Sequence, residues 1–212
     1  MTYPAQIPAT SAAVPRQLVA GIDLLTTRES DADGLAQAFA AELTAQGATA
    51  VTVATHWARV GELRHVALSL GAADIDADAV WSILCNALRP GADDSVGIAL
   101  GARYLGPPQL RDVADAAVVA HLTRGSGRVA VFPGSAELTG TVTVAQVLAS
   151  SAIDRLHVLA AADADPEALL VTRDHLRPRW VNGELVLDVQ PAAGGTLVPF
   201  ETPNPTPCCA EH

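Results

Sequence analysis

The fold is indicated most clearly by residues 176–189, LRPRWVNGELVLDV. Asn182-Gly183 stands between two runs of strand-forming residues, and this dipeptide tolerates the two positive φ angles that a type I′ turn requires. The sequence therefore predicts a two-residue β-hairpin whose apolar side faces a core. The turn sets the register, and the expected cross-strand pairs are Val181 with Glu184, Trp180 with Leu185, Pro178 with Leu187, and Leu176 with Val189.

The other side of the same hairpin carries a row of basic residues. Side chains alternate along a strand, so a strand that begins near residue 171 projects one such row, formed by Arg173, His175, Arg177 and Arg179. The register places Arg177 across from Asp188. One interpretation is the solvated side of an amphipathic strand, in which Asp188 and Glu184 satisfy the arginines.

The row also supports two functional hypotheses. Guanidinium groups bind phosphate and carboxylate oxygens in a bidentate manner, so Arg173, Arg177 and Arg179 are candidate ligands for a small anionic metabolite. An enzyme acting on such a metabolite would use His175 or His56 as its acid or base. In the second hypothesis the arginine row meets an acidic surface of another copy, which would make the protein a homo-oligomer.

The tail offers a separate chemical lead. Alternating prolines at Pro203, Pro205 and Pro207 favour an extended arm, and the arm ends in a Cys-Cys-x-x-His motif. We expect free thiols or metal ligands there, because adjacent cysteines bridge each other poorly. Two thiolates and an imidazole suit zinc or cuprous copper, although a closed zinc site needs a fourth ligand. The candidate metal ligands are Cys208, Cys209 and His212, and the alternative is a loosely docked tail with incidental thiols.

Composition excludes several classes of function. All 13 basic residues are arginine, so neither a lysine Schiff base nor a phosphate-binding loop with its usual lysine can form. The formal charge of −10 argues against binding to nucleic acid or to an anionic membrane surface. Residues 1–14 lack the features of a secretory signal, and no later segment is apolar over the length of a bilayer. Three cysteines form no disulfide framework, so we expect a cytoplasmic protein.

The hydrophobic pattern predicts an α/β (α+β) protein with a mixed sheet. Residues 1–15 form an expected flexible lead, residues 16–200 a single domain with a point of subdivision near residue 106, and residues 201–212 the tail. The N-terminal half is expected in the order β-α-β-β-α-β, that of a ferredoxin-like sandwich. Its predicted elements span residues 17–26, 30–47, 50–57, 63–70, 76–89 and 96–105. Beyond them the sequence predicts α-β-α-β-β-β, with Thr143 and Gln146 in capping-box positions.

Overall fold

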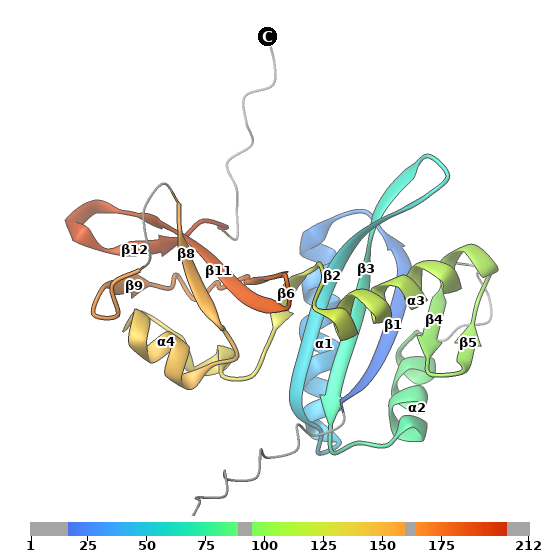
Figure 1. Ribbon diagram of the computed structural model, residues 1–212. Helices are drawn as coiled ribbons and strands as arrows, with labels where there is room; N and C mark the ends of the chain where they lie inside the picture. Colours follow the sequence, from blue (N-terminus) through green and yellow to red (C-terminus); the bar gives the residue numbers. More distant parts are fainter. Residues whose placement is uncertain (1–16, 89–94, 160–163, 203–212) are drawn as a thin grey trace, which may run out of the picture.

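The computed structural model describes residues 17–88, 95–159 and 164–202. Within these residues twelve strands form one mixed sheet, and the elements fall into two lobes that meet at β6 (Arg128–Val131) (Figure 1). The α/β class and the mixed sheet predicted from sequence are therefore confirmed.

The N-terminal lobe contains two long antiparallel strands, their shorter neighbours and three helices. In chain order these are β1 (Leu18–Thr26), α1 (Glu29–Ala45), β2 (Thr49–Val60), β3 (Leu63–Ala73), α2 (Ala77–Leu88), β4 (Gly97–Leu100), β5 (Arg103–Leu105) and α3 (Pro108–Thr123). The strands lie side by side in the order β5-β4-β1-β3-β2, and each neighbouring pair is antiparallel. The single strand expected over residues 96–105 is wrong, because the chain reverses at Gly101, whose φ is +58°, and forms two strands.

Helices cover both faces of this part of the sheet. On one face, alternating strand residues such as Ile22 and Leu68 pack with Phe39 of α1 and Leu84 of α2 in an apolar core. The four-residue spacing of Leu35, Phe39 and Leu43 predicts α1, and this side of the helix packs on the core. Ser30 with Asp33 resembles an N-cap signal in the sequence, but α1 begins at Glu29 and its N-cap residue makes no side-chain cap bond.

The opposite face is lined by small residues, and α3 packs closely against it. A Cβ atom added to Gly21 of β1 would lie 1.9 Å from the backbone oxygen of Ala114 in α3. A Cβ atom on Gly97 of β4 would similarly meet Leu110 at 2.4 Å. Glycine is therefore required at both strand positions for the helix to approach the sheet so closely.

The C-terminal lobe is built from short strands around a second apolar core. Its elements are η1 (Ser135–Glu137), β7 (Thr141–Thr143), α4 (Val144–Ser150), β8 (Arg155–Val158), β9 (Leu169–Val171), β10 (Arg179–Val181), β11 (Glu184–Pro191), η2 (Ala193–Gly195) and β12 (Leu197–Pro199). The capping box predicted for α4 is confirmed, since Thr143 and Gln146 exchange side-chain and backbone hydrogen bonds.

The predicted hairpin is confirmed at its turn but is shorter than expected. Asn182 and Gly183 have φ of 52° and 89°, and the two pairs nearest the turn form as predicted. The pairing ends with Arg179 opposite Val186, so the two outer pairs expected from sequence are wrong. Proline has no N–H to donate to a ladder, and the carbonyl oxygen of Pro178 accepts a hydrogen bond from Val129 instead, which directs this segment toward β6.

Candidate functional site

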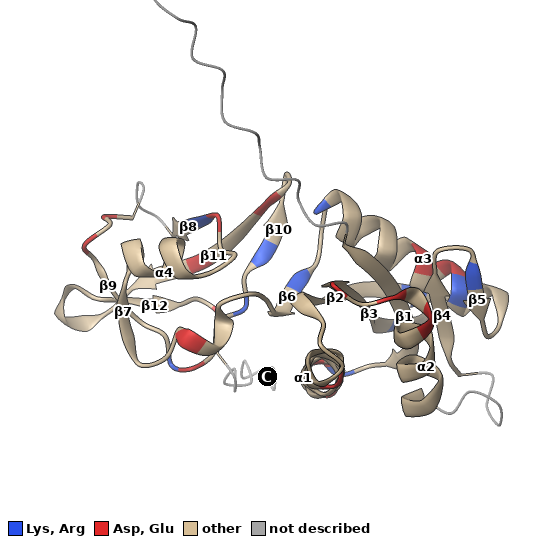
Figure 2. Cartoon of the chain, turned by 90° about the horizontal axis from the view of Figure 1, so that it is seen from below, with Lys and Arg blue, Asp and Glu red and all other residues tan. Residues whose placement is uncertain are grey.

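A cluster of charged residues lies where the two lobes meet. The backbones of β6 and β10 pair through Arg128 and Arg179. In Figure 2, both strands carry a blue segment, the colour of arginine, at this junction. We define the interlobe cluster as Asp33, Arg128, His175, Arg177 and Glu201, which come from α1, from β6, from the segment before β10 and from the segment after β12.

Asp33 holds two guanidinium groups of the interlobe cluster. Its carboxylate accepts hydrogen bonds from Nη1 and Nη2 of Arg128 at 2.8 and 3.0 Å, and from Nε of Arg177 at 3.2 Å. All three side chains are largely buried. Burial alone would raise the pKa of Asp33, but the hydrogen bonds and charges of Arg128 and Arg177 outweigh it and hold this pKa below its ordinary value.

Glu201 binds the other edge of Arg128. Its carboxylate accepts from Nε and Nη2 of Arg128, and its side chain is 37% exposed, against 15% for Asp33. Burial disfavours the charged form of Arg128, but its hydrogen bonds with Glu201 and Asp33 raise its pKa above the ordinary value. Arg128 is thus a permanent cation with one buried and one partly exposed carboxylate partner.

His175 lies beside these groups, and its Nε2 makes no hydrogen bond with the described residues. Nε2 is buried, has no hydrogen-bond partner among the described residues, and lies 3.9 Å from Oε1 of Glu201. Burial, followed by the charge of Arg177, lowers the pKa of His175. A neutral imidazole can donate or accept a hydrogen bond at neutral pH, so His175 can bind a group placed between it and the arginines.

A cavity of about 80 Å³ opens beside the cluster. Its charged and aromatic lining consists of Arg128, Arg177, Arg179, Asp188, Phe200 and Glu201. Arg179 donates hydrogen bonds to Asp188. Burial alone would raise the pKa of Asp188, but its hydrogen bonds with Arg179 and His157 outweigh burial and lower this pKa. Because a water molecule occupies about 30 Å³ in the liquid, the cavity has room for a group the size of a carboxylate.

The structure places the three predicted ligand arginines differently. Arg177 and Arg179 line the same cavity, as the alternation of side chains predicts. The expected contact between Arg177 and Asp188 is wrong, because Arg177 bonds Asp33 and Arg179 takes Asp188. Arg173 is exposed and lies in a turn with φ of 54°, outside the cavity, because the strand expected from residue 171 ends there.

His56 lies on the other face of the sheet and does not join His175. Its Nε2 is 2.7 Å from Oγ of Ser69, and that oxygen is 2.9 Å from Nδ1 of His121 in α3. Trp180 of β10 packs on both imidazoles, with ring centroids 6.3 Å from His56 and 4.7 Å from His121. The side chain of His56 is buried between the lobes, and its Nδ1 has no hydrogen-bond partner among the described residues.

His65 of β3 contacts Asp23 rather than His56. Its Nε2 is 2.9 Å from Oδ2 of Asp23, and neither side chain is exposed. Asp23 also accepts a hydrogen bond from the backbone of Leu25. This dyad satisfies buried polar groups within the N-terminal lobe.

The expected metal ligands Cys208, Cys209 and His212 lie outside the described residues, so metal binding by them stays a prediction. Within residues 17–88, 95–159 and 164–202, no group of three or more His, Cys, Asp and Glu side chains is arranged to hold a metal ion. No helix in the described part of the chain is both long and apolar enough to cross a membrane.

Comparisons with known proteins found no match. No protein-family model matches the sequence, and no curated protein or solved structure matches the chain.

Arg128, Asp33 and Glu201 were not found by sequence reasoning. Arg128 is separated from Asp33 by 95 positions and from Glu201 by 73. No local pattern signals such contacts. The nearest signal is the alternation that groups His175 with Arg177, since these are two of the five residues of the cluster.

Proposed function

We propose that the protein binds a small molecule carrying a carboxylate or phosphate group in the cavity beside the interlobe cluster. One observation carries this proposal: three guanidinium groups border a single cavity. The orphan Nε2 of His175 lies behind that lining, 3.9 Å from Oε1 of Glu201. Anions of this kind are bound by arginine forks and by imidazole donors.

Glu201 supports the proposal because it occupies the position that such a ligand would take. Its carboxylate is the more exposed partner of Arg128, and it lies near His175 without reaching hydrogen-bond distance. Asp33, Asp188 and Glu201 already pair with Arg128, Arg177 and Arg179, so a ligand anion that binds Arg128 competes with Glu201. Asp33 stays in place, since it is held by two arginines.

Thermal unfolding with added phosphate and with malonate tests the proposal. A ligand present at 100 times its dissociation constant stabilises the folded state by about 2.7 kcal/mol. For a chain of this size that corresponds to a rise in melting temperature of roughly 5–10 °C. We expect the rise in the wild type, a larger rise at the same concentration in Glu201→Gln, and none in Arg177→Gln.

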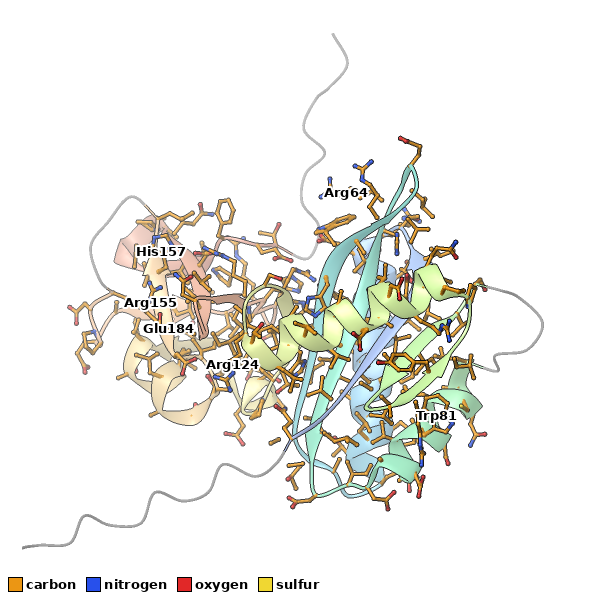
Figure 3. All side chains as sticks on the ribbon, turned by 45° about the vertical axis from the view of Figure 1, so that its right-hand side comes forward. Arg64, Trp81, Arg124, Arg155, His157 and Glu184 are labelled. Atoms are coloured by element: carbon orange, nitrogen blue, oxygen red, sulfur yellow. The ribbon has the colours of Figure 1, made fainter. Side chains whose placement is uncertain are left out.

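Arg155→Gln is the matched control. Arg155 is also paired with a carboxylate, that of Glu184 (labelled in Figure 3), but both side chains are well exposed and neither lines the cavity. This variant should respond to anions as the wild type does. The proposal is wrong if neither anion stabilises the wild type or Glu201→Gln, or if Arg177→Gln and Arg155→Gln respond equally.

We also infer that the N-terminal lobe belongs to the ferredoxin-like architecture. The antiparallel order β4-β1-β3-β2 and the placement of α1 and α2 on one face support this assignment. The strands β5 and β6 at the two edges, and α3 on the second face, are additions to that arrangement.

A further inference from the structure

A second and larger cavity adjoins the interlobe cluster and shares Arg177 with it. This cavity of about 250 Å³ is lined by residues of both lobes. Its polar lining consists of Gln37, Ser135, Thr139, Asp174 and Arg177, and aliphatic side chains complete it. At about 30 Å³ per water molecule, it has room for a molecule of on the order of eight non-hydrogen atoms.

Arg177 offers this space a free donor. Its Nε bonds Asp33, and its Nη1 donates to the carbonyl oxygen of Leu176 at 3.0 Å. Within the described part of the chain Nη2 makes no hydrogen bond, and it is not one of the buried orphan atoms, so it remains accessible. A guanidinium only donates, so Nη2 selects an acceptor, and an anionic acceptor binds best.

Asp174 presents the opposite charge to the same cavity. Its Oδ1 accepts from the backbone N–H of Gly140 at 3.0 Å, which fixes the direction of the carboxylate. Arg173 and Asp174 both adopt left-handed backbone conformations, with φ of 54° and 51°. Two consecutive non-glycine residues in this region cost conformational energy, and such strain is concentrated at functional sites.

Gln37 adds a second acceptor. Its Nε2 donates to the backbone oxygen of Ala130 at 3.3 Å, which leaves Oε1 as the group it offers to the cavity. Asp174 and Gln37 therefore both require donors from a ligand, whereas Arg177 requires an acceptor. The site is complementary to a molecule with an anionic end and a donor-rich, cationic end.

We infer that the ligand is a small amino acid or a related zwitterion, with its carboxylate on Arg177 and its ammonium group on Asp174. This inference rests on the proposed function, because it uses the same arginine as the anion site. A zwitterionic ligand is also compatible with the negative charge of the protein. A chain of net charge −10 repels anions at a distance, whereas a zwitterion has no net charge to be repelled.

Isothermal titration calorimetry with matched ligands tests this assignment. Alanine, β-alanine and γ-aminobutyrate vary the spacing between the two charges, and propionate lacks the ammonium group. A hydrogen bond to a charged partner changes affinity by about tenfold or more. We expect at least one of the amino acids to bind about tenfold more tightly than propionate.

Asp174→Asn is the decisive variant. Asparagine tolerates the left-handed backbone, and its Oδ1 can still accept from Gly140, so the turn is retained while the negative charge is lost. We expect the affinity for the amino acid to fall about tenfold and that for propionate to stay the same or rise. Far-UV circular dichroism and the melting temperature of the variant confirm that it folds.

Two outcomes overturn the inference separately from the proposed function. If propionate and phosphate bind but no amino acid binds more tightly, the zwitterion assignment is wrong and the anion site stands. If Asp174→Asn affects both ligand types equally, Asp174 does not contact an ammonium group. If no ligand of either type binds, both proposals fail.

Discussion

Acid should weaken the fold well before its carboxylates titrate, because two buried histidines cannot accept protons in place. His56 and His121 share Ser69 and pack against Trp180. Burial lowers the pKa of His56 to about 4. Burial also lowers the pKa of His121, to about 3, with further contributions from His56 and from Arg124. None of the hydrogen bonds in the described part of the chain joins either imidazole to a carboxylate.

The sign and size of the effect follow from these values. An unfolded histidine titrates near 6.5, so below that pH the unfolded chain binds protons that His56 and His121 refuse in the folded chain. The stability due to the neutral imidazoles is complete above pH 6.5 and is lost as pH falls toward their folded pKa values. Each pH unit below 6.5 removes about 1.4 kcal/mol from the free energy of unfolding for each imidazole that stays neutral. At pH 4.5, two units below, the loss is about 3 kcal/mol per imidazole.

Urea unfolding at pH 7.5, 6.5, 5.5 and 4.5 measures this loss, with circular dichroism and tryptophan fluorescence as probes. His121→Gln keeps a polar partner for Ser69 and cannot titrate, so the decline between pH 6.5 and 4.5 should shrink by about 3 kcal/mol, the contribution of one imidazole. His157→Gln is the comparison, because His157 is half exposed and bonds Asp188, so its substitution should not reduce the decline. A free energy of unfolding that stays level over this range would refute the reasoning, as would equal declines in the wild type and His121→Gln.

Three further substitutions test the packing and the cluster. Gly21→Ala places a methyl group on the backbone oxygen of Ala114 and should destabilise the protein by about 3 kcal/mol or more. In Gly34→Ala the added methyl group lies in α1 with no atom within 4 Å, so this variant should stabilise the protein by about 0.5–1 kcal/mol. Urea unfolding should therefore give changes of opposite sign for the two glycine variants. Asp33→Asn leaves two largely buried guanidinium groups without their shared carboxylate, so we expect a loss of about 3 kcal/mol. A change below 1 kcal/mol would show that Arg128 does not depend on Asp33.

Local chemistry made part of the fold predictable. Asn182-Gly183 and the capping box at Thr143 act within a few residues, so their effects are visible in sequence and both are found in the structure. The hairpin expected from the alternating residues extends to Leu176, which is too far. The observed hairpin is shorter, because Pro178 lacks a ladder donor and the chain turns sharply at residues 173–174.

The candidate site was only half predictable for a different reason. Alternation correctly placed Arg177 and Arg179 on one side, but the identity of each carboxylate partner depends on how the lobes meet. Asp33 is in α1, the first described helix, and Glu201 follows the last described strand. Their contacts with Arg128 arise only when distant segments pack, and a single sequence carries no local sign of them.

The junction between the lobes has a consequence for cooperative unfolding. The strands β2 and β3 share a long ladder, whereas β6 and β10 pair through one residue from each strand. The halves are therefore held together by a few backbone hydrogen bonds, such as that from Val129 to Pro178, and by side chains, namely the indole of Trp180 and the carboxylate shared by Arg128 and Arg177. Removing one of these side-chain contacts should divide one melting transition into two. Each lobe would then exchange its amide hydrogens at its own rate.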